Sequence, residues 1–269
     1  MQQTKASLRK WALVVAFSWG IGIVLRLMNL RVEHVSYKII YFGDVMVSLK
    51  GIFPMDLRYP GIEIKVELIV LRAYLSQMEK GVNSVCENYI MEEEKTFKDA
   101  EYYEYQHVYN IAEDELPRII RMPFVVSIYA LFENSVERLL DYAKIKENNE
   151  LSLKDINGRS PLSKQNKYMK HVLGYDYQFS SAIMNKINNI SKVRNYVAHA
   201  NGNISNISKE KIIELEKIAD EVVGLTVDPK FIDISYDYLI HSMETIESTL
   251  KDLMNYMESK YGIGQTVRN

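Results

Sequence analysis

The chain has 269 residues, of which 47% are hydrophobic and 25% charged, a composition typical of a globular protein of one large or two small domains. Its 33 Lys and Arg nearly balance its 35 Asp and Glu, and the net charge of −2 excludes a bulk attraction for nucleic acid, so any such contact needs a local patch. A single cysteine, Cys86, excludes an internal disulfide framework and indicates a reducing, cytoplasmic location. The five histidines are scattered without a Cys/His cluster, so we expect no metal site, and nothing in the sequence indicates a cofactor.

Residues 1–30 form an apolar N-terminal segment with an uncharged run of 15 residues from Trp11 to Leu25. As a helix this run would span about 22 Å, less than the ~30 Å hydrocarbon core of a bilayer. Residues 11–25 are compatible with an anchor that attaches the protein to a membrane, with a buried or partner-facing helix, or with a signal peptide that is removed.

Residues 31–109 are predicted to form a helical extension. Its first part, 31–60, mixes apolar runs with Gly and Pro and indicates short helices or strands. From Ile62 onward the pattern predicts a long amphipathic helix or a helical pair. Its apolar positions recur every three or four residues and would form the packing stripe: Val66, Ile69, Val70, Tyr74 and Met78.

Residues 110–261 are predicted to form a helical domain, followed by a tail over 262–269. Pro117 is expected to open its first helix, with Pro123 in the first turn. One stripe would face the core: Val125, Ile128, Leu131, Phe132, Val136, Leu139 and Leu140.

Local end signals delimit the next two helices. Ser160 is expected to cap a helix that begins at Pro161 and ends at Gly174. Ser180 or Ser181 would cap the following helix, which ends at Asn201-Gly202 and turns Ile183, Ile187, Ile190, Val193 and Val197 to the core.

The C-terminal part is predicted to hold a helix over Lys209–Val223, a small β-hairpin in "VGLTVDPKFIDIS", and a long last helix that ends at Gly262. The fold class is therefore mainly all-α: a helix bundle with a small β-hairpin before the last helix and an N-terminal helical extension.

Three polar residues, Arg194, Asn195 and His199, stand in the last two turns of the helix that ends at Asn201. Asn195 and His199 are four positions apart and share a face, whereas Arg194 and His199 are about 140° apart. An arginine can neutralise a phosphate, and a histidine can accept and return a proton near neutral pH. These are the two needs of RNA cleavage by the neighbouring 2′-hydroxyl, although Arg and His at a helix end also serve simply to stabilise it.

The sequence "RNYVAH" resembles the Arg–x4–6–His signature of the HEPN superfamily, and "LPRIIRMPFVVSIYALFENSVERLLDYA" and "IDISYDYLIHSMETIESTLKDL" resemble its first and last helices. The resemblance covers roughly residues 110–261. It implies an all-α, typically homodimeric fold whose catalytic members are metal-independent endoribonucleases of toxin–antitoxin and antiviral defence systems.

The resemblance implies a role for each motif residue. His199 would be the general acid and base, Arg194 would stabilise the scissile phosphate, and Asn195 would orient the phosphate or the imidazole. Glu133 would pair with Arg194 and hold its side chain. One subgroup carries a tyrosine two residues after the histidine, but this chain has Asn201 there, so regulation through that tyrosine is not expected.

Basic residues outside the motif offer phosphate contacts. Lys164, Lys167 and Lys170 recur every three residues, and Lys192 lies on the motif helix. We expect a HEPN-type endoribonuclease that acts on RNA as a homodimer and is controlled by an antitoxin or another defence protein. The alternative is a non-catalytic HEPN dimer that binds a partner or a nucleotide, with or without membrane attachment.

Overall fold

The computed structural model describes residues 39–42, 45–48, 56–98 and 101–263, so residues 11–25 lie outside the described residues. The chain divides into two compact units, one of residues 1–56 with 261–269 and one of residues 57–260. In the first unit, β1 (Ile39–Phe42) and β2 (Val45–Ser48) pair antiparallel, with Ile39 opposite Ser48. The 31–60 region therefore contains strands.

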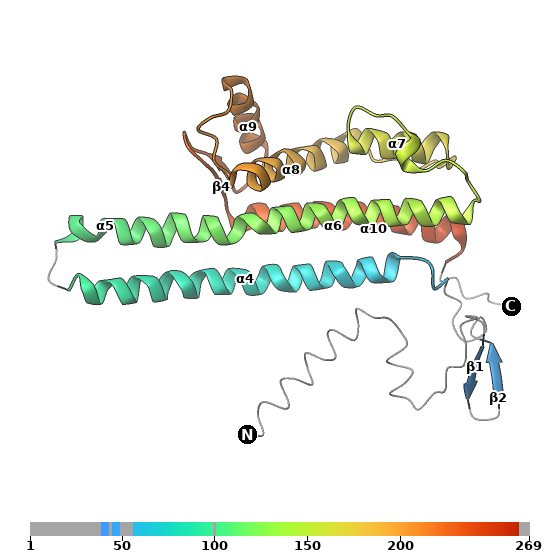
Figure 1. Cartoon of the computed structure of the whole chain (residues 1–269), viewed down its shortest axis with the longest axis horizontal. Coiled ribbons are helices and arrows are strands. Elements are labelled where there is room, and N and C mark those ends of the chain that lie inside the picture. Colours follow the sequence, from blue (N-terminus) through green and yellow to red (C-terminus); the bar gives the residue numbers. More distant parts are fainter. Residues whose placement is uncertain (1–38, 43–44, 49–55, 99–100, 264–269) are drawn as a thin grey trace. The chain divides into compact units, whose positions relative to one another are not determined.

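The second unit is a helix bundle, which confirms the all-α fold class (Figure 1). Its elements are α4 (Gly61–Thr96), α5 (Tyr102–Asn110), a π-helical turn (Ile111–Glu115), α6 (Leu116–Lys146), a 3-10 turn (Leu153–Asp155), α7 (Pro161–His171), α8 (Ser181–Ala200), α9 (Lys209–Glu221), β3 (Leu225–Val227), β4 (Ile232–Ile234) and α10 (Tyr236–Tyr261). Strands β3 and β4 form the predicted antiparallel hairpin, with Leu225 opposite Ile234. Residues 57–109 belong to the same compact unit as residues 110–260.

Helix α6 is the centre of the core and packs against α4 on one side and α8 on another (Figure 1). Six of the seven predicted stripe residues of α6 are buried, and Leu131 is half-buried. Pro117 lies in the first turn of α6, as predicted, but it does not start a separate element, because α5, the π-turn and α6 form one helical run over Tyr102–Lys146. Pro123 lies inside α6 on its exposed face rather than in a first turn. Solvent at that face can satisfy the carbonyl that a missing proline N–H leaves free.

The Tyr102–Lys146 run is long and apolar enough to cross a membrane by length and composition. Its α6 part is also the most buried helix of the bundle, with Phe124, Val125, Ile128 and Leu139 fully inside. A core helix of a bundle satisfies the same criteria, so this run is explained by its packing.

Helix α4 packs through a different face from the predicted one. Its buried side chains are Ile64, Leu68, Leu75, Met78 and Val82, whereas Val66, Ile69, Val70 and Tyr74 have between 43% and 68% of their surface exposed. The stripe prediction was wrong for these four and right for Met78. The N-terminal half of α4 has apolar residues on opposite faces. The spacing of apolar residues alone therefore does not say which face packs inward.

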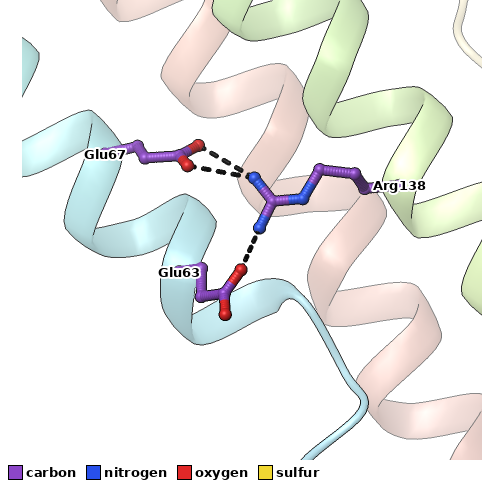
Figure 2. A network of polar contacts seen from close by, with 3 residues as sticks. All are labelled: Glu63, Glu67 and Arg138. Atoms are coloured by element: carbon purple, nitrogen blue, oxygen red, sulfur yellow. Dashed lines mark hydrogen bonds and ion pairs between the residues drawn. The ribbon is translucent and has the colours of Figure 1, made fainter. Parts of the chain in front are cut away.

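Ion pairs link α4 to α6. Figure 2 shows Arg138 of α6 reaching to two glutamates of α4: Nη1 donates to both carboxylate oxygens of Glu67 at 3.0 and 3.1 Å, and Nη2 donates to Glu63. Further along, Arg121 of α6 pairs with Glu79. These pairs join residues 42 to 75 positions apart and align the two helices antiparallel.

Candidate functional site at the end of α8

Helix α8 begins and ends as predicted. The Ser180 hydroxyl accepts a hydrogen bond from the backbone N–H of Ile183 at 3.2 Å, which is the expected N-cap. Asn201 at the other end adopts the left-handed conformation with φ 48°. Val193 and Val197 are buried, so Asn195 and His199 face away from the core in the last two turns.

Arg194 is held from three sides. Its Nη2 donates to the Glu133 carboxylate on α6 at 3.1 Å, and its Nη1 donates to the Asn195 side-chain oxygen at 2.9 Å. Its guanidinium carbon lies 4.5 Å from the ring centroid of Tyr129. The expected pairing of Glu133 with Arg194 is therefore present. The arginine side chain is only 24% exposed, so its position is defined by these contacts rather than by solvent.

His199 lies one turn beyond Asn195 and is exposed. Within the described part of the chain its ring has no hydrogen bond or ion pair, so its proton-exchanging nitrogens face solvent. The structure thus brings Arg194, Asn195 and Glu133 into contact and leaves His199 beside them with its ring free.

Comparison of the chain with protein-family models, curated proteins and solved structures gives no match.

Tyr129 is the site residue that sequence reasoning missed. It is 2% exposed and lies one helical turn before Glu133 on α6, so both side chains point toward α8. Burial raises the pKa of its phenol, which keeps the ring neutral beneath the guanidinium. The four-residue spacing from Glu133 is the signal that could have identified it.

The four predicted RNA-binding lysines do not form one cluster with Arg194. Lys192 pairs with Glu214 of α9 at 2.7 Å, beside a groove of about 460 Å³ between α8 and α9 in which lysines and glutamates alternate. Lys164, Lys167 and Lys170 lie on α7, which packs beside the N-terminal part of α8. The basic residues of α7 and the motif are thus at opposite ends of α8.

Among the residues that the structure describes, no three His, Cys, Asp or Glu side chains lie close enough together to hold a metal ion. What the site offers chemically is one restrained guanidinium, one amide and one solvent-facing imidazole. Such a set can neutralise an anion and move a proton.

Proposed function

We propose that this protein is a HEPN-type, metal-independent endoribonuclease that acts in defence or in toxin–antitoxin growth arrest. The observation that carries the proposal is that the restrained Arg194 and the exposed His199, whose imidazole pairs with no group of the described residues, share the last two turns of α8, in the stretch whose sequence resembles the HEPN signature. A guanidinium already oriented by Glu133 and Tyr129 loses little side-chain freedom when a phosphate binds.

The proposed reaction uses the RNA's own 2′-hydroxyl. An imidazole accepts the hydroxyl proton while O2′ forms a bond to phosphorus, and an imidazolium donates a proton to the leaving O5′ as the P–O5′ bond breaks. The products are a 2′,3′-cyclic phosphate and a 5′-hydroxyl end. Arg194 stabilises the charge that develops on the phosphoryl oxygens, and Asn195 orients the phosphate or the ring.

The site is proposed to be shared by two copies of the chain. Arg194 and His199 are five positions apart on one helix, about 140° around its axis, so one copy presents them poorly to a single phosphate. Two α8 helices facing each other would bring the arginine of one copy to the histidine of the other and supply two imidazoles, one as base and one as acid. RNA and a second copy are therefore the proposed partners, with an antitoxin or another defence protein as regulator.

The proposal is tested with purified full-length protein and single-stranded RNA in the presence of EDTA. We expect cleavage to 2′,3′-cyclic phosphate ends, and at least a hundred-fold loss in His199→Ala, since general acid–base catalysis contributes about 10²- to 10⁴-fold. His241→Ala is the matched control, because His241 is also exposed and lies on α10. His199 is exposed, so its replacement should leave the thermal midpoint nearly unchanged.

A clean dimer that leaves RNA intact would refute the nuclease and favour the second candidate, a non-catalytic HEPN dimer that binds a partner or a nucleotide. One observation supports that candidate: the two amino groups of Arg194 are already engaged by Glu133 and Asn195. The dimer itself is tested by light scattering. If the protein is monomeric at the concentrations at which it cleaves, the shared site is wrong.

Cytoplasmic location, with attachment to the membrane through residues 11–25, is a separate proposal. It predicts that full-length protein sediments with membranes and that a chain lacking residues 1–30 stays in the supernatant. If the full-length protein is wholly in the supernatant, the anchor does not exist.

A further inference from the structure

A groove of about 260 Å³ lies between α7 and the N-terminal part of α8, away from the motif. Its walls include Ser163, Asn166, Lys167, Lys170 and His171 from α7 and Met184 from α8. The α7 residues recur at spacings of three and four, so they line one side of that helix. Asn166 closes the groove toward the core, because its side chain holds both the N–H and the carbonyl of Phe179, at 2.9 and 2.8 Å.

The groove is basic in a chain that is slightly acidic overall. Helix α7 contains three lysines and a histidine and no Asp or Glu. Lys170 and His171 are exposed and pair with no carboxylate of the described residues. Lys167 uses one of its three donors on the carbonyl of Asn157, at 3.1 Å, and keeps two. Lys192, by contrast, is neutralised by Glu214.

A row of side chains on α8, polar from Asn188 onward, leads from this groove to the motif. Met184, Asn188, Ser191, Asn195 and His199 follow one another at spacings of four, three, four and four, so they lie along one face of the helix. The buried residues Ile190 and Val193 lie on the other side of the helix, whereas Ser191 is half-buried and borders the core beside Ile187. From Met184 to Arg194 and His199 the helix rises about 15 and 22 Å, respectively.

We propose that the groove binds the phosphate backbone of single-stranded RNA, on a strand that continues along α8 to the motif. The inference rests on the proposed function and adds the path of its substrate. A groove of about 260 Å³ accommodates about one phosphate with its sugar. At a stacked rise of about 3.4 Å per nucleotide, the groove is at most about seven nucleotides from His199. An RNA strand fits better than a membrane surface, because the groove is joined by α8 to the motif proposed to cleave RNA.

The binding test uses a fluorescein-labelled 12-nucleotide RNA of mixed sequence and full-length His199→Ala protein, which does not consume it. The variant is Lys167→Gln with Lys170→Gln. The matched control is Lys80→Gln with Lys95→Gln, two exposed lysines of α4 that pair with no carboxylate of the described residues. Each lost phosphate contact should reduce the magnitude of the slope of log K against log salt by about 0.7, so the two groove substitutions together should reduce it by about 1.4 and the control by none.

An activity test separates the groove from the chemistry. In the otherwise wild-type protein the groove variant should raise KM for the 12-nucleotide RNA and leave cleavage of a dinucleotide unchanged, because a dinucleotide cannot reach both places. An unchanged salt slope, an equal loss in the control, or no binding of the 12-nucleotide RNA by the His199→Ala protein would overturn the proposal.

Anionic lipid vesicles provide the competing outcome. If phosphatidylserine vesicles lose affinity for the groove variant while the RNA does not, the groove is a membrane contact and the proposal is wrong. If RNA binding depends on Lys167 and Lys170 but no variant of the motif affects any cleavage, the nuclease proposal fails and the groove remains an RNA site.

Discussion

Arg194 of α8 lies over the ring of Tyr129 of α6, with its guanidinium carbon 4.5 Å from the ring centroid. The two residues are 65 positions apart in the chain and meet because α6 and α8 pack together. The ring covers one face of the guanidinium, while Glu133 and Asn195 take two of its edges. These contacts use two of the five N–H donors of the guanidinium, which leaves three for a ligand phosphate.

The cation–π contact predicts different results for two substitutions at Tyr129. Tyr129→Phe keeps the ring and should retain most RNA cleavage. Tyr129→Leu removes it, and a contact worth about 0.5–2 kcal/mol should lower kcat/KM by roughly two- to thirty-fold. Both variants are compared at a temperature at which circular dichroism shows them folded. Equal losses in the two variants would mean that the phenolic hydroxyl, not the ring, matters.

The Glu133–Arg194 pair is partly exposed, at 41% and 24% of the side chains, so its contribution to folding stability should be small. A double-mutant cycle with Glu133→Gln and Arg194→Met, followed by urea denaturation, should give a coupling free energy of about 0.2–1 kcal/mol. The Lys192–Glu214 pair, at 42% and 50% exposure, is the control and should give a similar value. A coupling of several kcal/mol would show that the pair is desolvated in a dimer.

Gly202 should be the most sensitive glycine near the motif. Its φ is +73°, and a Cβ there would overlap the methyl group of the buried Met122 and approach Ile232 Cγ1 to 3.2 Å. Gly202→Ala should therefore lower the free energy of unfolding by about 1–2 kcal/mol for the left-handed backbone and by about 1–3 kcal/mol more for overpacking.

Gly174→Ala is the control for that substitution, because Gly174 has φ +60° and open space around it. It should lose only the backbone contribution of about 1–2 kcal/mol. Denaturant midpoints measure both. If the two variants lose equal stability, Met122 moves aside without penalty.

The buried hydroxyl of Tyr177 should lower the stability of the fold at alkaline pH. Burial raises its pKa to about 12, and its hydroxyl has no hydrogen-bond partner among the described residues. In the unfolded chain a tyrosine ionises near pH 10, whereas in the folded chain Tyr177 stays neutral to about pH 12. Its contribution to the free energy of unfolding is therefore fully present below pH 10 and is lost between about pH 10 and 12.

Tyr177→Phe should thus flatten the decline of stability over this pH range. At neutral pH it should be neutral or slightly stabilising, because it removes a buried unpaired hydroxyl. Tyr103→Phe, at a tyrosine that is 74% exposed, is the control and should leave the decline unchanged. Urea denaturation at pH 8, 10 and 11.5 provides the comparison.

The limits of α8 and its inward face can be predicted from the sequence, because Ser180, Asn201 and the apolar spacing are local signals. The face of α4 cannot, because Val66 and Leu68 are equally apolar and the choice depends on how α4 packs against α6, a helix far along the chain. Pro123 also shows that a local signal is not sufficient. A proline signals a helix start, but the residues before it already form a helix that packs in the bundle. The Tyr129–Arg194 contact depends on how α6 and α8 are aligned, which no local pattern specifies.

The end of α8 is also part of a small sheet. The N–H of Ile232 donates to the carbonyl of Gly202 at 2.9 Å, the N–H of Ile204 donates to the carbonyl of Lys230 at 2.8 Å, and Asn203 bridges to Phe231. Opening of the β3–β4 hairpin would therefore free the last turn of the motif helix, so these segments should exchange their amide hydrogens as one cooperative unit. The amides of Ile204 and Ile232 should then share one exchange rate, which measures how often this end of α8 opens.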